Sequence, residues 1–259
     1  MTRKQINLIT ARWSRLGAMF NTPPAHDAVD LERLLLDTAR AVSVNSRLLV
    51  MAVTWLARHG ATVAKHRLAA LIRRELEAEY NPAMGLLLEL ALAADKANRT
   101  RFDLAIGMCV GRTGNGRPLS DIECGNAVLS RLAKQRASIL SRKWGRWCEE
   151  FELKEEALRP VDWVMRHNPG LYERALVGGE LVASIVAECE SSDGAAESEA
   201  ELARRCGASR PAIRAALRSM ERCGRVRSIR QGRAHVVTLQ SPVRPVEGRA
   251  TKASRRRAS

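Results

Sequence analysis

The sequence predicts a mainly α-helical protein, with an all-α domain over residues 1–178 followed by a helix-turn-helix and a short β-hairpin over residues 179–239. Apolar residues recur at three- and four-residue steps through most of the first 190 residues, as in amphipathic helices. Near the C-terminus, two short helical segments joined by a tight turn precede two extended segments around a glycine. Residues 240–259 carry few apolar side chains and are expected to be a disordered basic tail.

Five helices are predicted in the first part of the N-terminal domain. Pro23-Pro24 is expected to end the first, Asp30 to cap the second, and Ser46 to cap a third that stops before Gly60. Asn81-Pro82 is expected to open the fifth, and short connections favour antiparallel helical hairpins. The apolar positions that define them include Ile6, Ile9, Trp13, Leu16 and Phe20; Leu31, Leu34, Leu35 and Val42; Leu68, Leu71, Ile72 and Leu76; and Leu86, Leu87, Leu90 and Leu92.

The middle of the chain continues the helical pattern. Residues 126–147 resume a basic helical pattern, in which Trp144 and Trp147 are interpreted as core or interface anchors. A helix is expected to begin at Pro160 and to break at Asn168-Pro169-Gly170. Residues 111–116 have the glycine spacing of a phosphate-binding loop but lack its Lys and Ser/Thr, so the segment is interpreted as a connector.

Composition excludes several classes of protein. No run of about 18 apolar residues exists that could span a bilayer, and no secretory signal is recognised, so we expect a cytoplasmic protein. The six cysteines include no Cys-x-x-Cys pair and are interpreted as small buried hydrophobic residues, so no metal or cofactor is expected. We also expect no enzymatic activity, because no catalytic set stands at a recognisable spacing.

Positive charge is concentrated at the C-terminal end. Residues 204–259 contain 15 Arg and 1 Lys against 2 Glu, a net charge of +14, whereas residues 1–203 have a net charge of +1. Arginine clusters bind phosphates through charge-assisted hydrogen bonds and release condensed counterions. Double-stranded DNA is therefore the expected partner.

The helix-turn-helix follows from local signals. Ser198 and Glu201 have the spacing of a capping box, and Gly207 can adopt the left-handed conformation that ends the first helix. Ser209 can cap the second helix, with Pro211 in its first turn. On that helix, Ile213, Leu217 and Met220 form an apolar stripe, while Arg210, Arg214, Arg218 and Arg222 form a basic stripe centred about 120° away. One face can therefore pack while the other contacts a groove of DNA.

Gly224 is expected to end the second helix, and two extended segments then flank Gln231-Gly232-Arg233 as a β-hairpin. Over residues 180–239, the segments 198–203, 209–217, 224–226 and 231–233 resemble the winged helix-turn-helix of GntR-type bacterial regulators. The resemblance implies that Arg210 and Arg214 contact bases in the major groove, and that Gln231, Gly232 and Arg233 form a wing tip in the minor groove. It covers this module alone: GntR regulators place the winged helix first, and here it comes last.

We therefore interpret the chain as a DNA-binding protein that is most simply a transcriptional repressor. Arg210 and Arg214 are the candidates for guanine edges. The groups expected to contact phosphates or the minor groove are Ser209, Arg218, Arg230 and Arg233, with Arg255, Arg256 and Arg257 adding non-specific attraction. The N-terminal domain is expected to mediate homodimerisation or to contact a protein partner, and a dimer would favour half-sites about 10 base pairs apart. Two alternatives stay open: a plasmid replication or partition protein, and an antitoxin-like module that binds an acidic protein.

Overall fold

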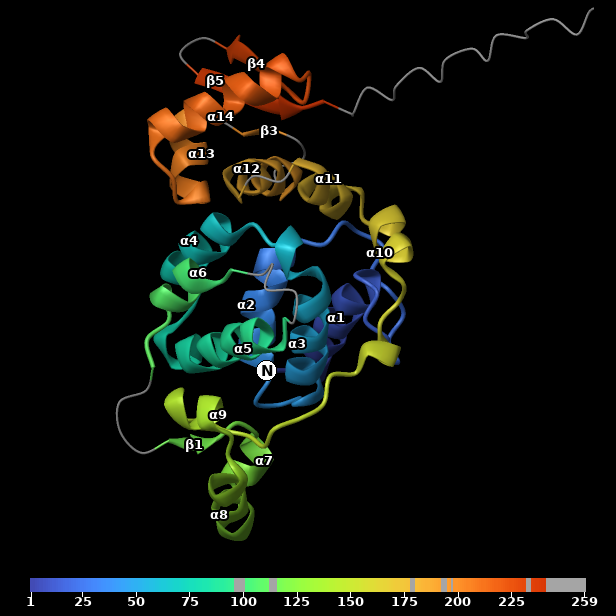
Figure 1. Cartoon of the computed structure of the whole chain (residues 1–259), viewed down its shortest axis with the longest axis vertical. Coiled ribbons are helices and arrows are strands. Elements are labelled where there is room, and N and C mark those ends of the chain that lie inside the picture. The colour runs from blue at the N-terminus through green and yellow to red at the C-terminus, as the bar shows by residue number, and fades with distance from the viewer. Residues whose placement is uncertain are drawn as a thin grey trace, which may run out of the picture.

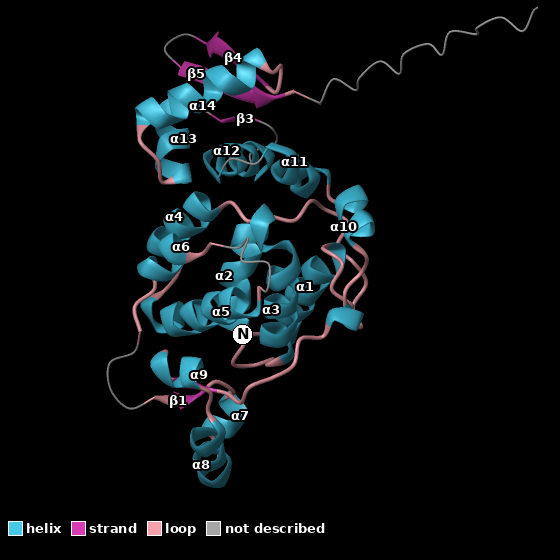
Figure 2. Ribbon diagram, in the orientation of Figure 1, coloured by secondary structure: helices cyan, strands magenta, loops and turns pink. Residues whose placement is uncertain are grey.

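The computed structural model describes residues 1–95, 101–111, 116–177, 180–191, 195–196, 198–231 and 234–240. Several predicted features lie outside these residues: the tail with Arg255, Arg256 and Arg257, the wing-tip residues Gly232 and Arg233, and the centre of the connector 111–116. The described chain is mainly helical, as predicted, with a small sheet near its C-terminal end (Figures 1 and 2). None of its helices has the length and apolar character needed to cross a bilayer.

Residues 1–177, called the body from here on, are built around six helices. These are α1 (Arg3–Arg15), α2 (Leu31–Ala41), α3 (Arg47–His59), α4 (Lys65–Glu75), α5 (Asn81–Ala94) and α6 (Asp103–Met108). Trp13 and Trp55 are fully buried between α1, α2 and α3, with ring centroids 5.7 Å apart in an edge-to-face arrangement. The indole of Trp13 donates to Thr38 Oγ1 at 2.9 Å and that of Trp55 to the Leu16 carbonyl at 2.8 Å. Both polar tips are therefore satisfied inside an apolar core.

Two helix ends differ from the sequence prediction. The first helix ends at Arg15 and does not continue to Phe20, because Gly17 has a φ of +92° and a Cβ there would lie 2.7 Å from Val164 Cγ2. Tertiary packing against α10 (Val161–His167) thus stops the helix well before Pro23. Ser46 precedes α3 in helical conformation and its side chain makes no capping hydrogen bond. The predicted Asp30 cap is confirmed, since its carboxylate accepts from the Arg33 amide.

The helical pattern predicted over residues 126–147 is confirmed for most of the segment, but it does not extend to its end. The segment contains α8 (Ala127–Arg136), α9 (Ile139–Lys143) and the short strand β2 (Arg146–Trp147), which pairs in parallel with β1 (Arg117–Pro118). Trp144, just after α9, packs against Gly85 of α5, where no Cβ would fit, and its indole donates to Glu89 at 2.9 Å. Trp144 is thus a core anchor, as predicted.

The chain then reaches the opposite end of the molecule through α10 and α11 (Pro169–Val177), which are separated at Asn168. Residues 180–240 form the part called the head. It contains α12 (Glu180–Ser191), β3 (Ala195–Ala196), α13 (Glu199–Cys206), α14 (Arg210–Arg222), β4 (Val226–Gln231) and β5 (Ala234–Leu239). The predicted hairpin is present as β4 and β5, which pair antiparallel, and β3 adds to the other edge of β5.

The head has an apolar core of its own, separate from the core of the body. Residues from α12, α13, α14 and the sheet meet there, including Ile185, Leu202, Ile213, Leu217 and Val237. Helix α12 supplies Ile185 and two further residues to this core, and is therefore described as part of the head. Burial of these side chains is the main term that holds the small module together.

Buried ion pairs fix the head on the body. Arg67 of α4 is fully buried and donates to Asp30, Glu32 and Glu188, the last of which lies on α12. Arg174 of α11 is 3% exposed and bridges Glu32 and Glu190. Removing one member of such a network leaves a buried charge without its partner, which typically costs about 3–5 kcal/mol. The orientation of the head is therefore set by charge as well as by apolar contact.

Candidate nucleic-acid interface

The two predicted stripes of α14 separate as expected. Ile213, Leu217 and Met220 are 0%, 3% and 4% exposed and point into the core of the head. The basic stripe, Arg210, Arg214, Arg218 and Arg222, is exposed along the other side of the helix. Because its apolar face is buried, the helix is fixed in orientation and presents a row of guanidinium groups to the solvent.

Local capping sets where α14 begins. Gly207 ends α13 with a φ of +66°, and Ser209 Oγ then accepts from the Ala212 amide at 3.4 Å. The tight turn thus directs the chain from α13 into α14 within three residues. Arg210 occupies the first turn of α14, where the free N–H groups and the helix dipole attract anions.

The predicted capping box at the start of α13 is only half formed. Ser198 Oγ accepts from the Glu201 amide at 3.1 Å, as predicted. The Glu201 carboxylate, however, accepts from Arg204 and Arg205, and these hydrogen bonds lower its pKa to about 2. The spacing of Glu201 and these arginines, three and four residues, was visible in the sequence, so this pair could have been predicted.

Arg214 has a partner that sequence reasoning missed. Its Nη2 and Nε lie 3.0 and 3.1 Å from Glu199 Oε2 at the start of α13, and the two side chains are 54% and 27% exposed. The pair joins two helices whose contact depends on the fold, so no local spacing indicated it. Glu199 fixes the Arg214 guanidinium at the start of α13 and also places a negative charge beside the basic stripe.

The segment from Arg225 to Gln231 carries further arginines. Arg227 on β4 is exposed, whereas Arg225, just before β4, forms an ion pair with Glu173 of α11 and ties the hairpin to the body. Arg230 and Gln231 belong to β4, opposite His235 and Ala234 of β5. The structure therefore brings Ser209, Arg210, Arg214 and Arg218 together on one helix and places the Arg230 and Gln231 backbone in the adjoining hairpin. The tip that joins the strands is not described.

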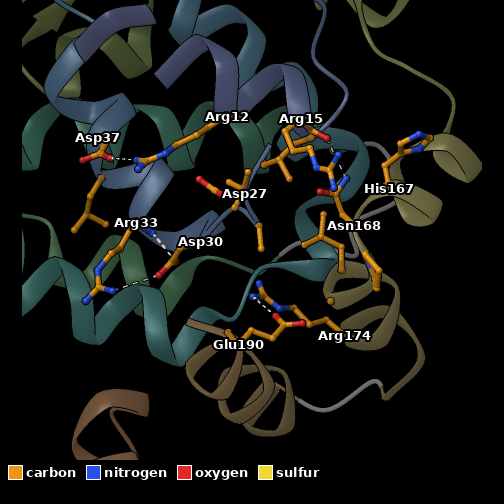
Figure 3. A pocket seen from close by; sticks show the side chains of 18 of the residues that line it. Arg12, Arg15, Asp27, Asp30, Arg33, Asp37, His167, Asn168, Arg174 and Glu190 are labelled. Carbon is orange, nitrogen blue, oxygen red and sulfur yellow. Dashed lines mark hydrogen bonds and ion pairs between the residues drawn. The ribbon is translucent and has the colours of Figure 1, made fainter. Parts of the chain in front are cut away.

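A second feature is a cavity of about 1060 Å³ where α1, α2, α10, α11 and α12 meet (Figure 3). Its lining is rich in charge, but most charged side chains are paired: Arg12 with Asp37, Arg33 with Asp30, and Arg174 with Glu190. Burial raises the pKa of both Asp37 and Glu190 despite these partners. No serine, threonine, cysteine or lysine is among the described residues that line the cavity.

The cysteines only partly follow the sequence prediction. Cys109, Cys189 and Cys206 are buried, and burial raises the pKa of the first two thiols to about 12. Cys148 is half-buried, whereas Cys124 and Cys223 are exposed. In the part of the chain that the structure describes, no three His, Cys, Asp or Glu side chains are grouped as metal ligands.

Comparison with protein-family models, with curated proteins and with solved structures found no match to this chain. Interpretation of the head therefore depends on its own geometry.

Proposed function

We propose that the head is a winged helix-turn-helix that binds duplex DNA, with α14 as its recognition helix and the β4–β5 hairpin as its wing. The observation that carries the proposal is the exposed arginine stripe of α14, backed by a buried apolar stripe and placed after a tight turn. The order of elements, α12, β3, α13, α14, β4 and β5, with β5 between β3 and β4 in the sheet, also supports the proposal.

Each candidate side chain has a distinct role in this proposal. Arg210 and Arg214 reach guanine O6 and N7 in the major groove, since a guanidinium can donate to both acceptors at once. Ser209 and Arg218 contact phosphates on either side of the helix and set its register on the duplex. Arg230, Gln231, Gly232 and Arg233 belong to the wing and contact the minor groove or the backbone beside it.

Transcriptional repression is the use that fits such a module most simply, because occupancy of an operator needs no further chemistry. A plasmid replication or partition protein would use the same surface on a different site. An antitoxin-like protein would instead place the basic face of α14 on an acidic protein partner. A repressor and a plasmid replication or partition protein must both bind DNA, whereas an antitoxin-like protein must bind another protein. A DNA-binding experiment therefore separates the antitoxin-like function from the other two.

Selection of bound fragments from random duplex DNA at physiological salt tests the proposal. We expect enrichment of one short motif. The triple variant Arg210→Ala, Arg214→Ala, Arg218→Ala should lose it, while a control that removes three exposed arginines elsewhere, Arg3→Ala, Arg117→Ala, Arg166→Ala, should keep it. Absence of any enriched motif, or equal enrichment by both variants, would refute base recognition by α14.

A further inference from the structure

The cavity where α1, α2, α10, α11 and α12 meet is shared by the two parts of the molecule (Figure 3). The body lines it from four helices and from the loop before α2, and the head adds Ala187 and Glu190 of α12 and Leu239 of β5. Its volume of about 1060 Å³ is at the upper end of the range for sites that hold small organic molecules. The cavity is thus large enough for an amino acid or a short peptide.

The charges that line the cavity balance each other. Five arginines and five acidic residues are among the described lining residues, so a ligand with a net charge of either sign would add a charge without a partner. Four of these arginines form ion pairs, and so do four of the acidic residues. Within the described chain, the two lining residues that form no ion pair are Arg15 and Asp27.

Arg15 has the surroundings of a side chain that binds an anion. It belongs to the last turn of α1, and its backbone carbonyl accepts from the Asn168 amide at 3.1 Å, which ties this turn to the start of α11. The side chain is half-buried, and its Nε is fully covered without a hydrogen-bond acceptor among the described residues. Because the guanidinium has lost water without gaining a partner, a carboxylate that accepts two hydrogen bonds from it would be held firmly.

Two acceptors accompany Arg15 at the cavity, and Figure 3 shows all three side chains. Asp27, in the loop before α2, is exposed and supplies a negative charge. His167 Nδ1 lies 2.8 Å from the Trp163 carbonyl oxygen. Since a carbonyl oxygen can only accept, this nitrogen carries the proton, and Nε2 of the neutral ring is then the acceptor available to a ligand. The cavity therefore offers a site for a cation beside its site for an anion.

We propose that the cavity binds a small zwitterion, with its carboxylate on Arg15 and its ammonium group on Asp27. Such a ligand has no net charge, and it supplies the partner that each of these side chains lacks within the described chain. Apolar lining residues, among them Leu16, Val29 and Leu171, favour an apolar side chain on the ligand. Free amino acids and short peptides share this chemistry and differ in the distance between their charged groups.

Thermal melts of the full chain without DNA test the site, with L-leucine, leucylglycine and leucylglycylglycine as probes. At least one probe should raise the Tm by about 2–4 °C when it is present at several times its Kd. A response to leucine assigns the site to amino acids, and a response to the peptides alone assigns it to short peptides. No shift with any probe overturns the proposal. Because no DNA is present, neither result bears on the proposed DNA binding.

Analogues that lack one charged group test the two contacts separately. The amide of the active probe lacks the carboxylate, and its N-acetyl derivative lacks the ammonium group. Each should bind at least about tenfold more weakly than the probe, as expected for the loss of a charge-assisted hydrogen bond. An amide or an N-acetyl derivative that binds as tightly as the zwitterion overturns the proposal.

Matched substitutions connect the contacts to the two residues. Arg15→Met should abolish the shift in Tm, and Asp27→Asn should make the probe and its N-acetyl derivative equally weak ligands. Arg3→Met is the control, because Arg3 is exposed at the other end of α1, and it should respond as the wild type does. Asp27 is exposed, so Asp27→Asn tests the site even if Arg15→Met does not fold. A wild-type response in either variant overturns the contact assigned to that residue.

Discussion

At the scale of single residues, Arg214 combines an exposed place on the basic stripe with an ion pair to Glu199. An exposed pair of this kind contributes little to stability, so DNA can compete for the guanidinium at small cost. Arg214→Ala should therefore weaken binding to a selected duplex by about 1–3 kcal/mol and relax preference at one base pair. Competition between the selected duplex and a scrambled one measures the effect.

Arg256→Ala provides the comparison for Arg214→Ala. Arg256 has arginines on both sides in the C-terminal segment, so its loss should weaken binding to both duplexes slightly and alike. A thermal melt equal to that of the wild type is the control for folding. If Arg214→Ala weakened binding to both duplexes equally, the base-contacting role of Arg214 would be wrong.

His59 gives the body a defined dependence on pH. It is 3% exposed, its Nε2 has no hydrogen-bond partner among the described residues, and its ring lies 4.8 Å from that of Trp55. Burial, aided by the charge of Arg58, lowers the pKa of His59 to about 4. The unfolded chain, with a histidine pKa of about 6.5, therefore binds a proton that the folded chain does not bind between about pH 6.5 and pH 4.

The sign of the effect follows from this difference. Stability associated with neutral His59 is fully present above about pH 6.5 and is lost as the pH falls towards 4, by at most about 3 kcal/mol. His59→Phe should flatten the loss of unfolding free energy between pH 7 and pH 4.5, as measured by urea unfolding. The same substitution at exposed His26 is the control, and equal pH dependence of the two variants would contradict the prediction.

At the scale of elements, the turn between α13 and α14 is seated on the body. Gly207 and Gly224 have nearly the same left-handed φ, +66° and +65°, but their surroundings differ. A Cβ at Gly207 would lie 3.2 Å from the His66 carbonyl oxygen and from Ala70 Cβ on α4, whereas a Cβ at Gly224 would meet nothing within 4 Å. The two glycines therefore differ in packing while sharing the same backbone requirement.

Substitution by alanine separates these contributions. Gly224→Ala should cost about 1 kcal/mol for the left-handed conformation alone. Gly207→Ala should lower the free energy of unfolding by the same amount and by about 1 kcal/mol more, because α4 must move to admit the methyl group. Urea unfolding of the full chain gives both values. If the two variants lost the same amount of unfolding free energy, the turn would not be packed tightly against α4.

Elements with strong local signals were predictable from the sequence. The Asp30 and Ser209 caps, the start of α5 at Asn81-Pro82, the left-handed Gly207 and the β4–β5 hairpin all depend on residues within a few positions of one another. The end of α1 was not predictable in this way. It depends on the packing of Gly17 against Val164, which is distant in sequence from α1.

The candidate site shows the same division. The alternation of buried and exposed residues on α14 follows from helical period alone. The partner of Arg214 lies 15 residues away on another helix, and the partner of Arg67 on α12 lies 121 residues away, so neither pairing could be read from spacing. The sequence likewise offered no signal for the cavity between body and head.

At the scale of the whole molecule, the body should fold without the head. Among the residues that the structure describes, its core contains none after Leu171, and Arg67 keeps Asp30 and Glu32 as partners when Glu188 is removed. A fragment of the body should end before α12, because the apolar residues of α12 would be exposed if the fragment included this helix without the rest of the head. A fragment of residues 1–177 should give a cooperative helical melt by circular dichroism and should not bind the selected duplex. An unfolded fragment, or one that binds this duplex as the full chain does, would show that this division is wrong.

The dependence of DNA binding on salt tests the central claim most directly. If one head neutralises about 4–6 phosphates, the logarithm of the association constant should fall against the logarithm of salt concentration with a slope of roughly −4 to −5. Fluorescence anisotropy of a labelled duplex, titrated with the full chain at several salt concentrations, gives this slope. A slope in that range is the result expected for a basic α14 face on duplex DNA. A slope near zero would contradict it and remove nucleic acid as the main partner.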